Sequence, residues 1–240
     1  MDEFDKQRRN FLIKALSSGL YAIGATGFSL PVMAMGQIPR ELTPGKSIYK
    51  LNGTVKVDKT LATLDTKITP HSTIETGPDS SIVFAVNKDA FIMRSSSKLE
   101  LQGSDVILTG LRLITGKLLS VFGKRQKEER LGVTTVTATI GIRGTGMYLE
   151  SDPEQTYICT CYGTADLAST TDAQSKETVI TEHHDAPRYI LAKEEAGKNI
   201  RLAPVINHTD EELELIESLV GRTVPFALTG DYGSMRKPKY

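Results

Sequence analysis

Residues 133–150 decide the fold class, and they read Val133-Thr-Thr-Val-Thr-Ala-Thr-Ile-Gly-Ile-Arg-Gly-Thr-Gly-Met-Tyr-Leu-Glu150. In the first half, apolar residues alternate with threonine and glycine, which is the pattern of a strand with one buried face. Gly144 and Gly146 then favour a tight reversal, because glycine tolerates positive φ. A half-buried strand and a turn are therefore predicted. The apolar face of that strand is formed by Val136, Ala138, Ile140 and Ile142.

Similar short apolar runs, separated by turn residues, begin at Ile48 and surround this stretch on both sides. They are Gly53–Val57, Ser81–Val86, Ala90–Met93, Lys98–Leu101, Val106–Leu108, Leu111–Ile114, Lys117–Phe122, Tyr157–Tyr162 and Thr178–Thr181. Runs at this regular spacing predict an all-β fold, a sandwich or stacked β-coil of many short strands.

A single short helix is predicted near the C-terminus. Thr209-Asp-Glu-Glu212 has capping-box spacing, and Gly221 would end the helix. One apolar stripe is formed by Leu213, Ile216, Leu219 and Val220. We expect this stripe to pack against the sheet, since burial of an apolar stripe is the usual source of helix stability.

The first 34 residues have the order of a signal peptide. A charged segment with Arg8 and Arg9 precedes an apolar stretch from Phe11 to Met35, and Val32-Met-Ala34 suits a signal peptidase. The arginine pair followed by Phe-Leu resembles the twin-arginine signal of folded exported proteins. A Sec leader or an uncleaved inner-membrane anchor remains as an alternative. The expected location is the periplasm, with membrane contact only if the leader is retained.

The remaining chain divides into a linker (35–47), a β domain with a C-terminal extension (48–206), a helix and packing segment (207–230) and a disordered tail (231–240). Beyond residue 34 it carries 25 basic and 26 acidic residues, because the leader holds four of the 29 basic and three of the 29 acidic ones. Binding to nucleic acid needs a concentrated excess of Lys and Arg. The balance therefore excludes nucleic acid as a partner.

Two blocks, Ile68–Val86 and Val133–Glu150, together with Gly116-Lys-Leu118, resemble the FecR domain in the order and spacing of their turns. The resemblance extends from Tyr49 to Leu167. It implies an extracytoplasmic β domain whose relatives sit in signalling proteins. It further implies a non-enzymatic binding, sensory or scaffolding module of the bacterial periplasm that has another protein as its partner.

Cys159 and Cys161 are the only cysteines of the chain, and alternation places them on one face of a strand. With His183 and His184 they form a ligand set that zinc, iron, copper or an iron–sulfur centre would accept. This set predicts a metal or redox-cofactor carrier as the alternative function. A reactive dithiol, a local disulfide and a pair of inert buried cysteines are the other interpretations.

Adjacent histidines on a regular strand point to opposite faces, so both can bind one ion only if Asp185 and Pro187 impose a loop. Otherwise one histidine binds, and Asp185, His208 or water completes the shell. A cysteine nucleophile with a histidine base is not favoured, because the chain carries no recognised catalytic signature. The sequence therefore predicts that the protein is not an enzyme.

Overall fold

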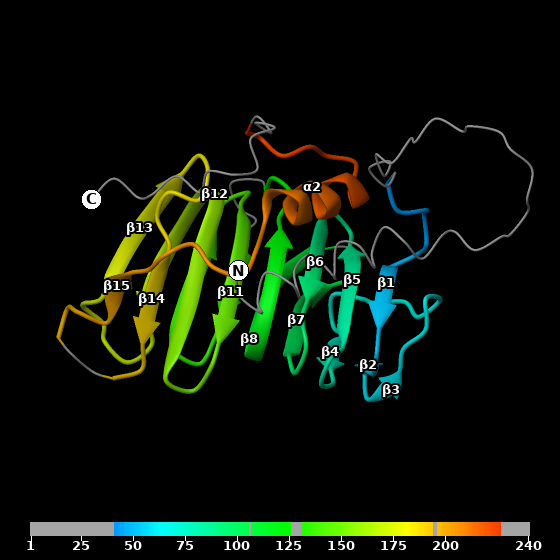
Figure 1. Cartoon of the computed structure of the whole chain (residues 1–240), viewed down its shortest axis with the longest axis horizontal. Coiled ribbons are helices and arrows are strands. Elements are labelled where there is room, and N and C mark those ends of the chain that lie inside the picture. Colours follow the sequence, from blue (N-terminus) through cyan, green and yellow to red (C-terminus); the bar gives the residue numbers. More distant parts are fainter. Residues whose placement is uncertain (1–40, 106, 126–130, 194–195, 227–240) are drawn as a thin grey trace, which may run out of the picture. The chain divides into compact units, whose positions relative to one another are not determined.

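The computed structural model describes residues 41–105, 107–125, 131–193 and 196–226. These residues form fifteen strands and one helix, α2 (Figure 1), which confirms the all-β prediction with a short C-terminal helix. The predicted leader (1–34), the start of the linker (35–40), residues 227–230 and the tail (231–240) lie outside the described residues. The elements are β1 (Ile48–Asn52), β2 (Val55–Val57), β3 (Thr60–Leu61), β4 (Thr73–Thr76), β5 (Ser81–Val86), β6 (Asp89–Met93), β7 (Lys98–Ser104), β8 (Ile107–Val121), β9 (Leu131–Thr134), β10 (Ala138–Ile142), β11 (Gly146–Ser151), β12 (Gln155–Ser169), β13 (Lys176–Thr181), β14 (Arg188–Leu191), β15 (Ile200–Leu202) and α2 (Asp210–Leu219).

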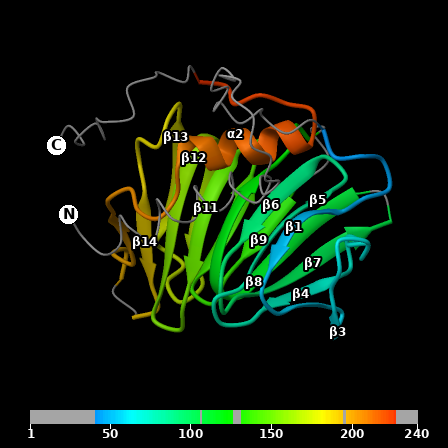
Figure 2. The same cartoon turned by 45° about the vertical axis from the view of Figure 1, so that its right-hand side comes forward.

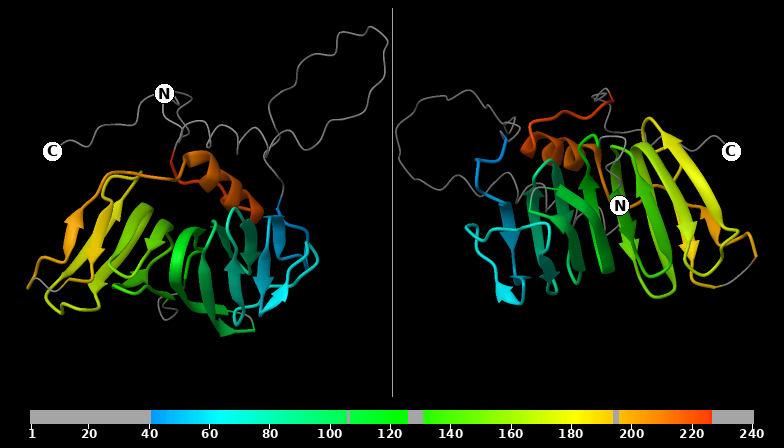
Figure 3. Two further views of the ribbon diagram at one scale, coloured as in Figure 1. Left: turned by 60° about the horizontal axis from the view of Figure 1, so that its bottom comes forward. Right: turned by 180° about the vertical axis from the view of Figure 1, so that it is seen from behind.

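The strands make two layers, which Figure 2 shows from the side. Sheet A has the order β1-β5-β6-β8-β11-β12-β14-β15, and sheet B has the order β3-β2-β4-β7-β8-β9-β10-β12-β13. Among the described strands the β8–β9 pair is parallel, and the other pairs are antiparallel. The early strands, blue and cyan, lie at the opposite end from the late ones, yellow and orange (Figure 3). The chain therefore builds both sheets progressively, as in a stacked β-coil.

Two long strands, β8 and β12, belong to both sheets. Each turns a corner at a glycine in the left-handed region, Gly116 and Gly163, both with φ of 93°. A Cβ at Gly116 would lie 2.5 Å from the Cα of Ser97, so no other residue fits that corner without movement of the backbone. The apolar runs between residues 106 and 122 predict three short strands. This prediction is wrong, because β8 is one continuous strand in which glycine bends the chain instead of ending the strand.

The apolar side chains form two clusters, one on each face of sheet A. The inner core lies between the sheets and includes Phe84 and Ile140. The outer core lies between sheet A and α2, and it contains Cys159 and Cys161. Val136 does not share the buried face predicted for it with Ala138, Ile140 and Ile142. It precedes the first residue of β10, and it is 45% exposed. Both cysteines thus occupy the face that the C-terminal segment covers.

Helix α2 crosses β8, β6 and β5 on the outer face of sheet A (Figure 1). The predicted capping box is present: the side chain of Thr209 accepts from the amide of Glu212, whose carboxylate accepts from the amide of Thr209. The buried stripe consists of Leu213, Ile216 and Leu219. Ion pairs hold both ends of the helix, one between Arg94 and Glu212 and one between Arg222 and Glu217. Within the described part, no helix has the length and apolar character to cross a membrane.

Candidate metal centre

Alternation places Cys159 and Cys161 on the outer face of β12, and a bulge at Cys161 adds Tyr162 to that face. The register with β11 pairs Tyr162 with Gly146 and Thr160 with Met147, so that Cys161 has no partner. A bulge of this kind lets two consecutive residues face the same side. Cys161 and Tyr162 accordingly both lie in the outer core, beside Cys159. Both cysteines are free and fully buried.

The loop after β13 brings His184 over these cysteines. The amide of His184 donates to the carbonyl of Cys161 at 2.9 Å, which fixes the loop on β12. His184 has a φ of 52°, in the left-handed region that residues with a Cβ avoid. This conformation breaks the alternation of a strand, so that the ring of His184 turns inward. Its side chain is 11% exposed, whereas that of His183 is 44% exposed.

The fourth group is His208, which lies two residues before α2. Its ring stacks on Tyr148 with the centroids 4.7 Å apart, and its Nδ1 donates to the carbonyl of Ile206 at 2.6 Å. A carbonyl can only accept, so the proton is on Nδ1 of this ring. The free Nε2 therefore points toward the cysteines and His184.

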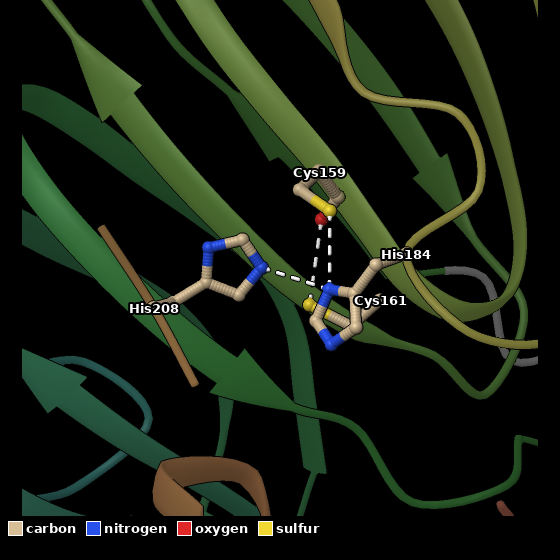
Figure 4. Close-up of side chains that lie close together, drawn as sticks. All are labelled: Cys159, Cys161, His184 and His208. Atoms are coloured by element: carbon tan, nitrogen blue, oxygen red, sulfur yellow. Dashed lines mark hydrogen bonds between the residues drawn. The ribbon is translucent and has the colours of Figure 1, made fainter. Parts of the chain in front are cut away.

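One ligand atom from each of Cys159, Cys161, His184 and His208 converges here, all within 4.8 Å of one another (Figure 4). Cys159 Sγ lies 3.4 Å from His184 Nδ1, which lies 2.9 Å from His208 Nε2. The edges of a tetrahedral zinc site are about 3.6 Å between sulfur and nitrogen and about 3.3 Å between two nitrogens, given metal bonds of about 2.3 and 2.05 Å. The three atoms that these two distances join thus need shifts of only a few tenths of an ångström.

The hydrogen bonds around the two rings leave a place for a positive charge. His184 Nε2 lies 3.0 Å from a carboxylate oxygen of Asp210, to which it donates, and the Nδ1 proton of His208 is already directed at Ile206. A neutral imidazole carries one proton, so the two facing nitrogens would both present lone pairs at 2.9 Å. A proton or a metal ion must lie between them. In metalloproteins, carboxylate and carbonyl acceptors orient histidine ligands in the same way.

In the absence of a metal, a proton takes that place. Burial opposes charge on His184, but the carboxylate of Asp210 and the sulfur of Cys159 outweigh it and raise the pKa of His184 to about 9. The hydrogen bond from Cys161, with help from His184, lowers the pKa of Cys159 well below its usual value, while burial raises that of Cys161. A thiolate, a thiol and an imidazolium thus share the centre. A metal ion that binds must displace the two protons on Cys161 and His184, so its affinity rises with pH and keeps rising above the His184 pKa of about 9, where the thiol of Cys161 still holds its proton.

The structure places three of the four predicted ligands together and separates the fourth. His183 is not in the group that converges with the cysteines, and its Nε2 lies 2.9 Å from Asp210. His208 stands in its place, one of the completing groups named above. Asp185 instead accepts from the amides of Glu182 and His183, both at 3.4 Å, and shapes the loop. Asp210 has no sequence signal of its own, because its contact with His184 depends on where α2 docks.

The chain has low structural similarity to solved proteins and no match among sequence families. No family model and no curated protein matches it. Two crystal structures of a "putative anti-sigma factor" from Parabacteroides distasonis ATCC 8503 are similar to it, with 7% and 9% identity and TM-scores of 0.43 and 0.42. Each alignment covers 55% of this chain and 57% of that chain, so the chain matches little more than half of their length. The functional argument therefore depends on the site itself.

Proposed function

We propose that this protein is a non-enzymatic metal-binding module whose centre holds one thiophilic divalent ion, zinc in the first place, on Cys159, Cys161, His184 and His208. The observation that carries the proposal is the pair of imidazole nitrogens 2.9 Å apart, on two rings whose other nitrogens each donate a proton to an oxygen acceptor. Two thiolates and two imidazoles in a tetrahedral arrangement are typical of zinc.

A single ion fits this geometry better than an iron–sulfur cluster. In a two-iron cluster with mixed ligands, the imidazoles bind one iron and the thiolates bind the other. Here Cys159 Sγ and His184 Nδ1 are only 3.4 Å apart, which is the edge of one coordination shell. Four protein ligands also leave no open position for a substrate, which favours a structural or sensory site over a catalytic one.

We also propose that the module is exported to the bacterial periplasm and is FecR-like, with another protein as its partner. Support comes from the leader-like residues 1–34, the turn motifs between Tyr49 and Leu167, and the all-β fold that carries them. A metal centre that is loaded before export would suit a twin-arginine route for folded proteins. In this proposal the metal-bound module acts as a binding or sensory component, not as a catalyst.

The test of the metal centre is elemental analysis of the purified full-length chain, followed by replacement of the ion with Co²⁺. We expect one ion per chain and a thiolate-to-cobalt charge-transfer band, because both sulfurs would bind the ion directly. Cys159→Ser/Cys161→Ser serves as the control and should lack the band. A wild-type protein with no stoichiometric metal and no cobalt band would overturn the proposal.

Export is tested by replacement of Arg8 and Arg9 together with lysine. We expect the variant to accumulate in the cytoplasm, since the arginine pair is the recognised element of a twin-arginine leader. Cell fractionation and immunoblotting measure the distribution, with the wild-type chain as the reference. Unchanged export in a strain that lacks the folded-protein translocase would show that the leader belongs to another route.

A further inference from the structure

A second group of metal-binding side chains lies on the solvent side of the buried centre. It consists of His183, His184 and Asp210, whose ligand atoms also lie within 4.8 Å of one another. His183 Nε2 is 2.9 Å from one carboxylate oxygen of Asp210, and His184 Nε2 is 3.0 Å from the other. His184 therefore belongs to both groups, with Nδ1 toward the cysteines and Nε2 toward the solvent side.

Exposure falls steadily from the outer group to the centre. The side chains of His183, Asp210 and His184 are 44%, 30% and 11% exposed, and both cysteines are fully buried. A hydrated ion from solution cannot reach the sulfurs directly. His183 and Asp210 are the most exposed metal-binding side chains of the two groups.

The backbone of the loop holds the two histidine rings on this path. In a regular strand the rings would point to opposite faces, but the left-handed φ of 52° at His184 turns both toward Asp210. Such a conformation costs of order 1 kcal/mol or more in a residue with a Cβ, and it persists only where the surroundings enforce it. The two rings pack edge to face, with the centroids 4.8 Å apart, and the ring centroid of Phe226 lies 4.3 Å from that of His183.

The chemistry of the outer group suits transient binding of a metal ion. A carboxylate and an imidazole bind a partly hydrated divalent ion more weakly than two thiolates do, and its remaining positions stay open to water. The negative charge of Asp210 attracts the ion, and the ring of His184, whose Nδ1 faces Cys159, lies between this group and the sulfurs. The buried centre alone does not account for His183, because the ligand atoms of His183 converge with those of His184 and Asp210 and not with the sulfurs.

We propose that His183 and Asp210 form a loading site through which a divalent ion enters and leaves the buried centre. The inference rests on the proposed function, and it makes that centre an exchangeable site instead of a permanently closed one. Removal of this intermediate binding site raises the free-energy barrier equally for entry and for exit of the ion. Loading and loss should therefore slow together, while the equilibrium affinity stays the same.

The experiment is stopped-flow mixing of the full-length apoprotein with Co²⁺, followed through the thiolate-to-cobalt band, and removal of the ion by an excess of chelator. His183→Ala should lower both rates about tenfold, the scale on which charged, focusing sites accelerate association. Affinity should change by less than about threefold, which is under 0.7 kcal/mol. His71→Ala is the matched control, because His71 is an exposed histidine that also faces an aspartate, Asp105, at 3.7 Å.

Three results would overturn the loading site, and they are separable. Wild-type rates in His183→Ala would show that the ion reaches the centre by another way. Faster loss with weaker affinity would make His183 a ligand or a support of the centre. A wild-type protein without any cobalt band would remove both the loading site and the proposed metal function.

Discussion

Replacing His208 with alanine is expected to weaken the affinity of the centre for zinc or cobalt by about 10²- to 10³-fold. Structural zinc sites bind with about 10–16 kcal/mol, so one of four ligands accounts for about 2.5–4 kcal/mol. His208 supplies its Nε2 at 2.9 Å from His184, and no other histidine reaches this position among the described residues. Competition with a chromophoric chelator measures the loss.

The same titration separates the two possible fourth ligands. His71→Ala should bind as tightly as the wild type, because that residue lies outside both metal-binding groups. His183→Ala should also retain its affinity within about threefold. If His183→Ala instead loses about 10²-fold and His208→Ala binds normally, the predicted set of Cys159, Cys161, His183 and His184 is right and the assignment of His208 is wrong.

Removal of the ion by a chelator is expected to lower the midpoint of thermal unfolding by about 8–16 °C. A free ion at about 1,000 times its Kd stabilises the folded state by about 4 kcal/mol. In a protein of 150–250 residues each kcal/mol shifts the midpoint by about 2–4 °C. The ion would join β12, the loop after β13 and the segment before α2, so all three must separate from it on unfolding.

Circular dichroism with and without chelator gives the midpoint directly. Cys159→Ser/Cys161→Ser provides the control, since its midpoint should be the same in both conditions. The wild type should then melt near the variant once its ion is removed. An identical midpoint for the wild type with and without chelator, at a metal content of one per chain, would mean that the ion binds the unfolded chain as well.

Most of the fold follows from local patterns in the sequence. Turn residues and two-residue alternation predict the strands, and the capping box at Thr209 predicts the start of α2. The corners at Gly116 and Gly163 were not predictable. A glycine that ends a strand and a glycine that bends one look alike in sequence, and only the close approach of Ser97 to Gly116 and of Thr145 to Gly163 distinguishes them.

The centre was predictable only where its residues share one strand. Alternation places Cys159 and Cys161 on a common face, and the structure agrees. The choice between His183 and His208 depends on a left-handed φ and on the docking of a segment 24 residues beyond His184. Neither leaves a periodic signal, because both arise from tertiary contacts instead of local preference.

The strands β8 and β12 run through both sheets, and this arrangement has a consequence for how the protein folds. Because each of these strands is continuous through its corner, ordering of one half in one sheet holds the other half close to its partners in the other sheet. Partners such as β1 and β5, or β12 and β14, are also far apart along the chain. The ordering of such non-local pairs is slow and concerted, so the body should fold as one kinetic unit with no separately folded half.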